Sequence, residues 1–231
     1  NVINPDDGIK YGEQALRLAE KLNWKKGIAM ASNILGGCFL SKSDYPKALE
    51  YYFKALKMFE ELGNRKWVAG ISGNIGIVFF RQSDYPKALE YYFKALKMFE
   101  ELGNKSGIAK NFLNMGIVYK DQSDYPKALE YYFKALKLHE ELGNKTGIAR
   151  SLGNIGNVYW RQSDYPKALE YYFKALELHE ELGNKKGVAL NSGNIGNVYW
   201  RQLDYPKALE YYFKALELHE ELGNKKGLDL I

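Results

Sequence analysis

A 40-residue repeat runs through the chain and constrains its fold more than any other feature. The segment DYPKALEYYFKAL recurs without an insertion or deletion, beginning at Asp44, Asp84, Asp124, Asp164 and Asp204. A fixed period of about 20 to 50 residues is typical of solenoids, in which each unit buries its apolar face against its neighbours. The 231 residues are therefore predicted to form a single array of stacked units.

Two helices are predicted in each period. From Tyr45 to Leu62, apolar residues recur at spacings of three and four, and lysine and glutamate occupy the opposite face, which is the pattern of an amphipathic helix ended by Gly63. From about Lys66 to Gln82, a second apolar stripe runs beside a row of small residues. We name the first pattern helix B and the second helix A. Short turns join them, so the repeated unit is an αα-hairpin.

Small and polar residues at fixed places in helix A predict how it packs and where it begins. Glycine inside a helix costs roughly 1 kcal/mol relative to alanine, so its recurrence predicts that two helices approach too closely for a Cβ atom. These glycines are Gly76, Gly116, Gly156 and Gly196. Asparagine side chains are good N-caps, and the candidates are Asn64, Asn104, Asn144, Asn184 and Asn224.

The combined pattern resembles the tetratricopeptide repeat. The last full repeat carries the small residues and aromatics of that family at matching offsets in both helices: Asn194, Gly196, Tyr199, Asp204, Tyr205, Ala208, Tyr211, Tyr212, Ala215 and Leu216. It departs in length, with 40 residues where about 34 is usual, and in having serine or Leu203 where the family often has glycine. The resemblance implies an all-α, right-handed α-solenoid of about 11 helices, similar to arrays in regulatory and signalling proteins.

The 40-residue grid sets the predicted boundaries within a single domain, 1–231. Residues 4–22 align with helix B alone, five repeats span approximately 24–63, 64–103, 104–143, 144–183 and 184–223, and 224–231 begin a further helix A. Neither end has the polar face of a capping repeat, so we expect a fragment of a larger regulatory protein. Exposed ends also allow copies to stack head to tail.

Charge and composition exclude several classes of function. The longest apolar run, Ile77 to Phe80, has four residues, far below the roughly 18 of a membrane span. The single Cys38 cannot form an internal disulfide, which favours a cytoplasmic setting without a membrane partner. A net charge of +5 is small for this length, and the repeated Glu60 and Glu61 would repel phosphate, which disfavours single-stranded nucleic acid as a ligand.

No catalytic or cofactor motif is present. His139, His179 and His219 occupy one position of helix B in successive repeats, so they do not converge, and we expect them to be surface residues. The chain has no HExxH motif, no pair of cysteines and no nucleophile elbow. We therefore predict no enzymatic activity and no cofactor.

One face of helix A varies between repeats and supplies the candidate site. In tetratricopeptide arrays this face lines the concave groove, so the resemblance implies that it contacts a ligand. The groove candidates are Phe80, Arg81, Lys110, Lys120, Arg150, Asn157, Trp160, Arg161, Asn194, Asn197, Trp200 and Arg201. Tryptophan and arginine are enriched at binding hot spots, and the cations outnumber Asp121, which favours an acidic or carboxylate-bearing peptide.

Alternative interpretations remain open at this point. The tryptophans can instead cover a neighbouring helix, and the cations can be solvated surface charge. The carboxylate clamp of chaperone-binding family members is incomplete, because its first lysine is replaced by Gly153, Gly193 or Leu113, so chaperone-tail binding is not predicted. A structural array that associates through its ends is the alternative to a peptide-binding scaffold.

Overall fold

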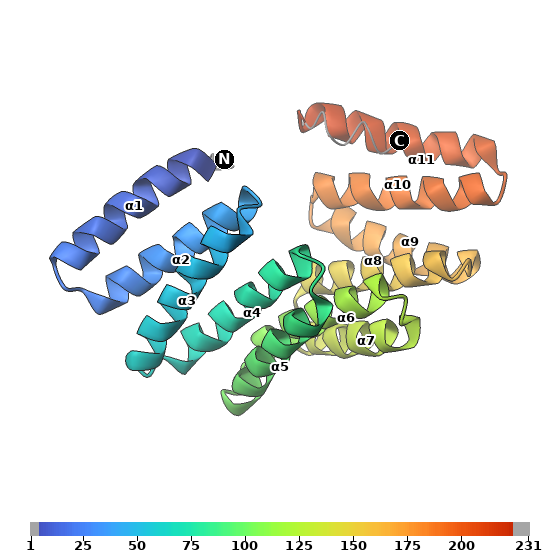
Figure 1. Cartoon of the computed structure of the whole chain (residues 1–231). Helices are drawn as coiled ribbons and strands as arrows, with labels where there is room; N and C mark the ends of the chain where they lie inside the picture. The colour runs from blue at the N-terminus through green and yellow to red at the C-terminus, as the bar shows by residue number, and fades with distance from the viewer. Residues whose placement is uncertain (1–4, 224–231) are drawn as a thin grey trace. The chain divides into compact units, whose positions relative to one another are not determined.

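The computed structural model describes residues 5–223, and this part of the chain consists of helices joined by short turns, without a strand. Each helix has 17 residues and begins and ends at the same places in the repeat. Figure 1 labels the helices in chain order. The helices are α1 (Pro5–Lys21), α2 (Lys25–Ser41), α3 (Tyr45–Glu61), α4 (Arg65–Arg81), α5 (Tyr85–Glu101), α6 (Lys105–Asp121), α7 (Tyr125–Glu141), α8 (Lys145–Arg161), α9 (Tyr165–Glu181), α10 (Lys185–Arg201) and α11 (Tyr205–Glu221). The predicted all-α class and the helix-turn-helix repeat are confirmed.

The predicted helix caps are confirmed wherever the structure describes them. In α4, α6, α8 and α10, helix A begins after an asparagine whose Oδ1 accepts a hydrogen bond from the backbone N–H three residues later, at 3.3 Å for Asn64, 3.0 Å for Asn104 and Asn144, and 3.1 Å for Asn184. The first helix A, α2, begins after Trp24 without a side-chain cap. Helix B begins in the same way after aspartate, with Asp44 as the first example. Asn224 and the predicted helix A start at 224–231 lie outside the described residues.

The turns that end the helices place one residue in the left-handed region. From α3 onward, helix B ends at a glycine with positive φ, such as Gly63 at 65°, and α1 ends at Asn23 with a φ of 50°. Helix A ends at a residue that carries a side chain in the same conformation, with φ of 61° at Ser83 and 63° at Leu203. This explains why glycine is usual in the family at the position of Leu203, because a Cβ atom makes this conformation unfavourable.

Helix A and the following helix B pack closely through a glycine that recurs at one position of helix A. A Cβ atom at Gly76 would lie 2.6 Å from the ring of Tyr92, and one at Gly156 would lie 2.7 Å from the ring of Tyr172. The tyrosine ring therefore occupies the space that any larger residue would need. The predicted close approach is confirmed at Gly76, Gly156 and Gly196. At each of these glycines a tyrosine ring of helix B packs directly on the backbone of helix A.

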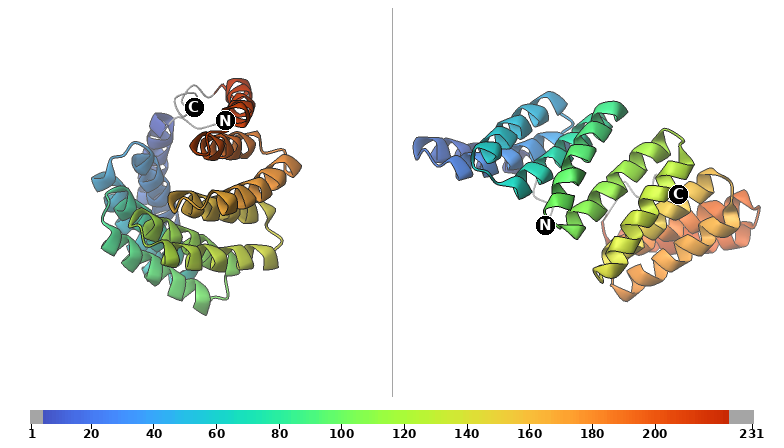
Figure 2. Two further views of the ribbon diagram at one scale, coloured as in Figure 1. Left: turned by 90° about the vertical axis from the view of Figure 1, so that its right-hand side faces the viewer. Right: turned by 90° about the horizontal axis from the view of Figure 1, so that it is seen from below.

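The chain divides into two units, and each is described by itself. Unit 1 extends to Val118 and unit 2 begins at Tyr119, near the end of α6. In unit 1, the hairpins α2–α3 and α4–α5 share a core around Leu35, Phe59 and Ile75. In unit 2, the hairpins α8–α9 and α10–α11 pack side by side through α9 and α10 (Figure 2).

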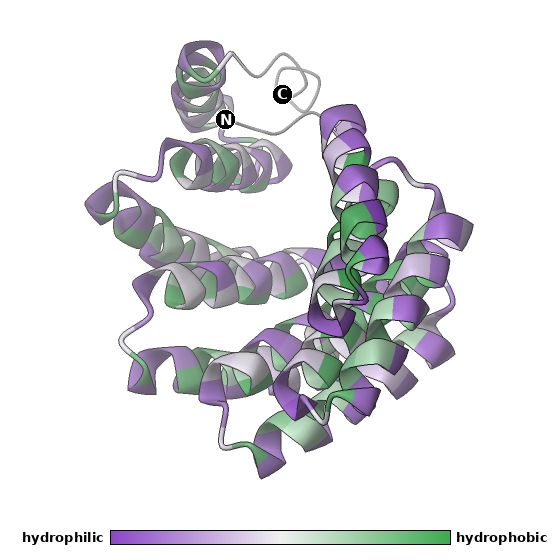
Figure 3. Ribbon diagram, turned by 90° about the vertical axis from the view of Figure 1, so that its left-hand side faces the viewer, coloured by the Kyte–Doolittle hydropathy of each residue, from purple (hydrophilic) through white to green (hydrophobic). Residues whose placement is uncertain are grey.

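Each helix carries hydrophobic and hydrophilic residues on different sides, as an amphipathic helix must in a stack of hairpins (Figure 3). Among residues 5–223, no helix combines the length and the hydrophobicity needed to cross a bilayer.

Candidate functional site

Unit 2 brings nine of the twelve groove candidates to three cavities that share lining residues. The other three, Phe80, Arg81 and Lys110, belong to unit 1. Phe80 lies 6.1 Å from the ring of Tyr85, Arg81 lines a smaller cavity of about 260 Å³, and Lys110 is exposed on α6. The candidate site is therefore described on unit 2 alone.

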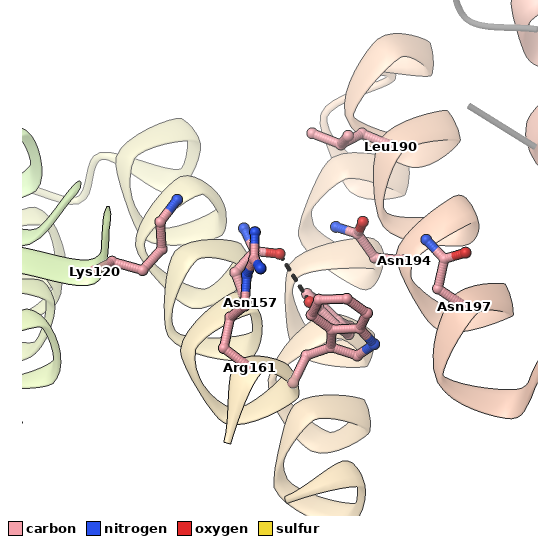
Figure 4. A pocket seen from close by; sticks show the side chains of 8 residues that line it. Lys120, Asn157, Arg161, Leu190, Asn194 and Asn197 are labelled. Carbon is pink, nitrogen blue, oxygen red and sulfur yellow. Dashed lines mark hydrogen bonds between the residues drawn. The ribbon is translucent and has the colours of Figure 1, made fainter. Parts of the chain in front are cut away.

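The main cavity, of about 610 Å³, lies between α8 and α10 (Figure 4). Positions spaced by three and four residues lie on one face of a helix, which brings Asn157, Trp160 and Arg161 of α8 together. Asn194 and Asn197 face them from α10. Its lining is completed by Lys120 from the end of α6, Tyr172 from α9 and Leu190 from α10.

A second cavity, of about 460 Å³, continues the first one because both are lined by Trp160 and Asn197. Trp200, Arg201 and Tyr212 complete it. A third cavity, of about 280 Å³, shares Asn157 and Leu190 with the main one and brings in Arg150. The three cavities form one surface of unit 2, which we call the groove face.

Two asparagines on the groove face are held by tyrosines of helix B. The Tyr172 hydroxyl donates a hydrogen bond of 2.8 Å to Asn157 Oδ1, and the Tyr212 hydroxyl donates one of 2.8 Å to Asn197 Oδ1. Burial raises the pKa of Tyr172 well above its usual range, so this hydroxyl keeps its proton. With Oδ1 occupied in this way, the Nδ2 group of each asparagine is left to donate to a ligand.

The cations of the groove face differ in how they are engaged. Lys120 forms an ion pair of 3.1 Å with Asp121, so its charge is partly balanced. The Arg161 guanidinium lies 5.5 Å from the ring centre of Trp160, which is a cation–π arrangement. Arg161 and Arg201 are both exposed. The groove face is therefore electropositive through these two arginines and through Arg150 and Lys186 of the third cavity.

The two tryptophans have different surroundings. Trp160 is half-buried and packs against the core of unit 2, and its Nε1 is buried without a hydrogen-bond partner. Trp200 is 53% exposed and lies edge-on to Tyr205 at 5.0 Å. Trp160 thus combines a packing role with a place on the cavity wall, and Trp200 offers the larger free surface.

Sequence reasoning missed Tyr172 and Tyr212 as parts of the groove face. The tyrosines stand on the apolar stripe of helix B, a pattern that predicts a place in the core, where their rings do lie. Because helix A has a glycine opposite each tyrosine ring, the tyrosine hydroxyl reaches the asparagine on the groove face. Leu190 stands on the variable stripe of helix A, the face that the family resemblance assigns to the groove, and it lines two of the cavities.

The prediction that the histidines are surface residues was wrong for His139 and His179, which are 3% and 8% exposed. Each ring packs on the glycine three residues after an N-cap asparagine, Gly147 or Gly187. His179 Nδ1 accepts a hydrogen bond of 3.0 Å from Asn184 Nδ2. Burial lowers the pKa of both rings, and the nearby Arg150 lowers that of His139 further. His219 is half-buried.

These histidines form no metal site with other residues. Within the described residues, no three side chains of histidine, cysteine, aspartate or glutamate gather closely enough to hold a metal ion.

The chain belongs to the tetratricopeptide repeat family. The family model matches four overlapping segments, 27–101, 67–141, 107–181 and 147–221, which together cover most of the sequence. No curated protein matches the sequence.

Solved structures with a similar fold support the same architecture. BtubC (BKLC) from P. vanneervenii has 21% identity and a TM-score of 0.81, with 95% of this chain and 92% of that chain covered. The Rap conjugation gene regulator of the plasmid pLS20, in complex with the Phr* peptide, has 19% identity, a TM-score of 0.76 and coverage of 90% and 58%. The apo form of the quorum sensor NprR from B. thuringiensis has 18% identity, a TM-score of 0.76 and coverage of 97% and 64%. This chain therefore spans less than two thirds of the two regulators.

Proposed function

We propose that the chain is a protein-interaction scaffold without catalytic activity, and that the groove face of unit 2 binds a peptide or an extended segment of a partner protein. The observation that carries the proposal is the continuity of its cavities, which place donor amides, a tryptophan surface and arginines along one face. The structure of the plasmid pLS20 regulator with a peptide supports it by analogy of fold.

The amides suit the backbone of an extended peptide. A peptide presents alternating C=O and N–H groups, and asparagine can donate and accept at the same time. Asn157, Asn194 and Asn197 line the main cavity together. Because Tyr172 and Tyr212 hold two of these side chains in place, binding costs less conformational entropy than it would with mobile amides.

The charges favour an acidic group on the ligand. Arginine binds carboxylates through two parallel hydrogen bonds, and both Arg161 and Arg201 are exposed on the groove face. No carboxylate of the described residues lines the three cavities, and Asp121, at the equivalent position of α6, is already paired with Lys120. An acidic side chain or a terminal carboxylate would therefore find cations on this surface.

Charge reversal at the two arginines tests the proposal. The double variant Arg161→Glu and Arg201→Glu is measured by fluorescence anisotropy against an array of short synthetic peptides, each carrying an acidic residue. Hydrogen bonds to charged groups contribute about 1.5 to 3 kcal/mol, so we expect the affinity of the peptides that bind to fall about tenfold or more.

The matched control is Arg81→Glu, which changes the same repeat position in unit 1. Far-UV circular dichroism checks that each variant remains helical. Equal binding by the double variant and the parent chain would remove the arginines from the site, and the absence of binding by any peptide would refute the proposed function. Association through the chain ends stays a prediction.

A further inference from the structure

The third cavity of the groove face differs in chemistry from the other two. It lies between the first halves of α8 and α10 and encloses about 280 Å³. Ala149, Gly153, Gly187 and Leu190 contribute carbon surface to its wall, and no carboxylate lines it. Leu190, which is 59% exposed, belongs to the wall of this cavity and of the main one. The cavity is therefore a largely apolar extension of the peptide site.

Two positions of the repeat explain why a cavity can exist here. At Gly153 a Cβ atom would meet only Asn191 Oδ1, at 3.5 Å, so a side chain at this position would enter open space. One repeat earlier the same position is Leu113, and two repeats before Leu190 the equivalent residue is Lys110. Gly153 thus leaves the space of the cavity empty, and Leu190 supplies apolar surface at its edge.

The polar groups of this cavity restrict what it accepts. Asn191 is 3% exposed, and its Nδ2 donates a hydrogen bond of 2.9 Å to the Gly187 carbonyl. Its Oδ1 is buried without a partner. Arg150 and Lys186 also line the cavity, and their positive charge disfavours a cationic ligand group.

We propose that this cavity is a specificity pocket that takes an apolar side chain, between leucine and phenylalanine in size, from the same peptide whose acidic group contacts Arg161. The inference rests on the proposed function. Asn157 and Leu190 line both this cavity and the main one, so a single peptide can contact Arg161 and also place a side chain in the pocket. The positive charges of Arg150 and Lys186 at this cavity are compatible with a peptide that carries acidic residues at other positions.

A filled pocket tests this inference. Gly153→Leu places a leucine side chain into the cavity, at a position where the chain already carries Leu113 in another repeat. Gly193→Leu is the matched control, because it makes the same change at the same repeat position, where a Cβ atom meets nothing within 4 Å and which does not line the cavity. Leu190→Lys, which copies Lys110, is a second variant that keeps the fold and removes the apolar edge.

The probe is a set of synthetic peptides that share one fixed aspartate and carry alanine, leucine, phenylalanine, asparagine or lysine at each other position. With the parent chain, we expect leucine or phenylalanine at one position to raise affinity about tenfold over alanine, as burial of one apolar side chain provides. Gly153→Leu and Leu190→Lys should remove this preference, and Gly193→Leu should keep it.

The outcomes separate this inference from the proposed function. Peptides that bind with dependence on Arg161 but without an apolar preference would overturn the pocket and leave the function standing. An apolar preference that survives both Gly153→Leu and Leu190→Lys would also overturn it. If no peptide of the set binds, both proposals fall.

Discussion

Units 1 and 2 place different residues at one position near the end of helix B. In α3 and α5 of unit 1 the position holds phenylalanine, and Phe59 is fully buried and stacked on Trp67 at 5.1 Å. In unit 2 it holds His139 and His179, which are buried in the same place. The comparison of these four helices teaches that one buried place accepts either a phenylalanine or a histidine ring, so the polarity of the ring can differ there. The equivalent residue of α1 is Ala19, which has no ring.

The N-cap asparagine makes the exchange possible. Asn184 Oδ1 accepts a hydrogen bond of 3.1 Å from the Gly187 N–H, which fixes the amide so that Nδ2 donates to His179 Nδ1 at 3.0 Å. The neutral ring then carries its proton on Nε2. A proton on Nδ1 would face the amide donor, so a charged His179 conflicts with the cap of α10. Unit 1 has no histidine and therefore no such conflict.

The largest effect that would sharpen the comparison is the removal of the ring. Phe59→Ala deletes a fully buried aromatic ring and its stacking on Trp67, so we expect a loss of about 3 to 5 kcal/mol in the free energy of unfolding. His179→Ala deletes a smaller ring and one hydrogen bond, and the expected loss is about 2 kcal/mol.

Urea unfolding followed by circular dichroism measures both losses, and hydrogen exchange assigns each to its unit. Equal destabilisation by the two substitutions would contradict the view that the two rings contribute in different ways.

The next effect concerns pH. Burial lowers the pKa of His139 and His179 below the ordinary 6.5, so the unfolded chain binds more protons than the native chain as the pH falls through this value. The free energy of unfolding is therefore expected to fall as the pH is lowered from about 7.5 to about 5.5. The contribution of the two neutral histidines to stability is complete above the pKa of the unfolded chain. The loss should appear in hydrogen exchange of unit 2.

The double variant His139→Phe and His179→Phe copies the unit 1 residue into unit 2 and should flatten this pH dependence. Phe99→Leu in unit 1 is the control that alters the same position without a titratable group. A pH dependence that persists in the double variant would assign it to other groups and break the comparison.

The smallest effect is expected at the turns that end helix A. Leu203 has a φ of 63° and is 70% exposed, so replacing it with glycine removes backbone strain and loses no buried surface. Because glycine also makes the unfolded chain more flexible, we expect a net gain of about 0.5 to 1 kcal/mol. Ser83→Gly in unit 1, with a φ of 61°, provides the matched substitution, and thermal unfolding measures both. A loss of stability at Leu203→Gly would show that its side chain makes a favourable contact.

Most of the fold could be predicted from the sequence, because a repeat of constant length shows the same helix pattern several times. The spacing of apolar residues defined both helices, the asparagines marked the start of helix A, and Gly76 and Gly156 indicated close packing. Five copies of one pattern leave little freedom in assigning helix boundaries. The division near Val118 left no signal in the sequence, because α6 is continuous across it.

The histidines show where the same reasoning failed. Chemical type suggested a surface position, but the register aligns His139 and His179 with Phe59 and Phe99, which lie on the apolar stripe. Position in the repeat is the stronger signal, because packing geometry repeats even where residue type changes. The hydroxyls of Tyr172 and Tyr212 could not be placed in advance, since their partners Asn157 and Asn197 lie on another helix.

The most direct test of the central claim, that unit 2 binds a peptide on its groove face, observes the asparagine side chains themselves. Nuclear magnetic resonance of the chain with isotope-labelled asparagine follows each side-chain amide as an acidic peptide selected from the array is added. We predict that the signals of Asn157, Asn194 and Asn197 shift, while Asn74 of unit 1, which donates to Asn33 at 3.3 Å, stays unchanged. Binding that moves Asn74 and leaves the three groove-face amides unmoved would contradict the account.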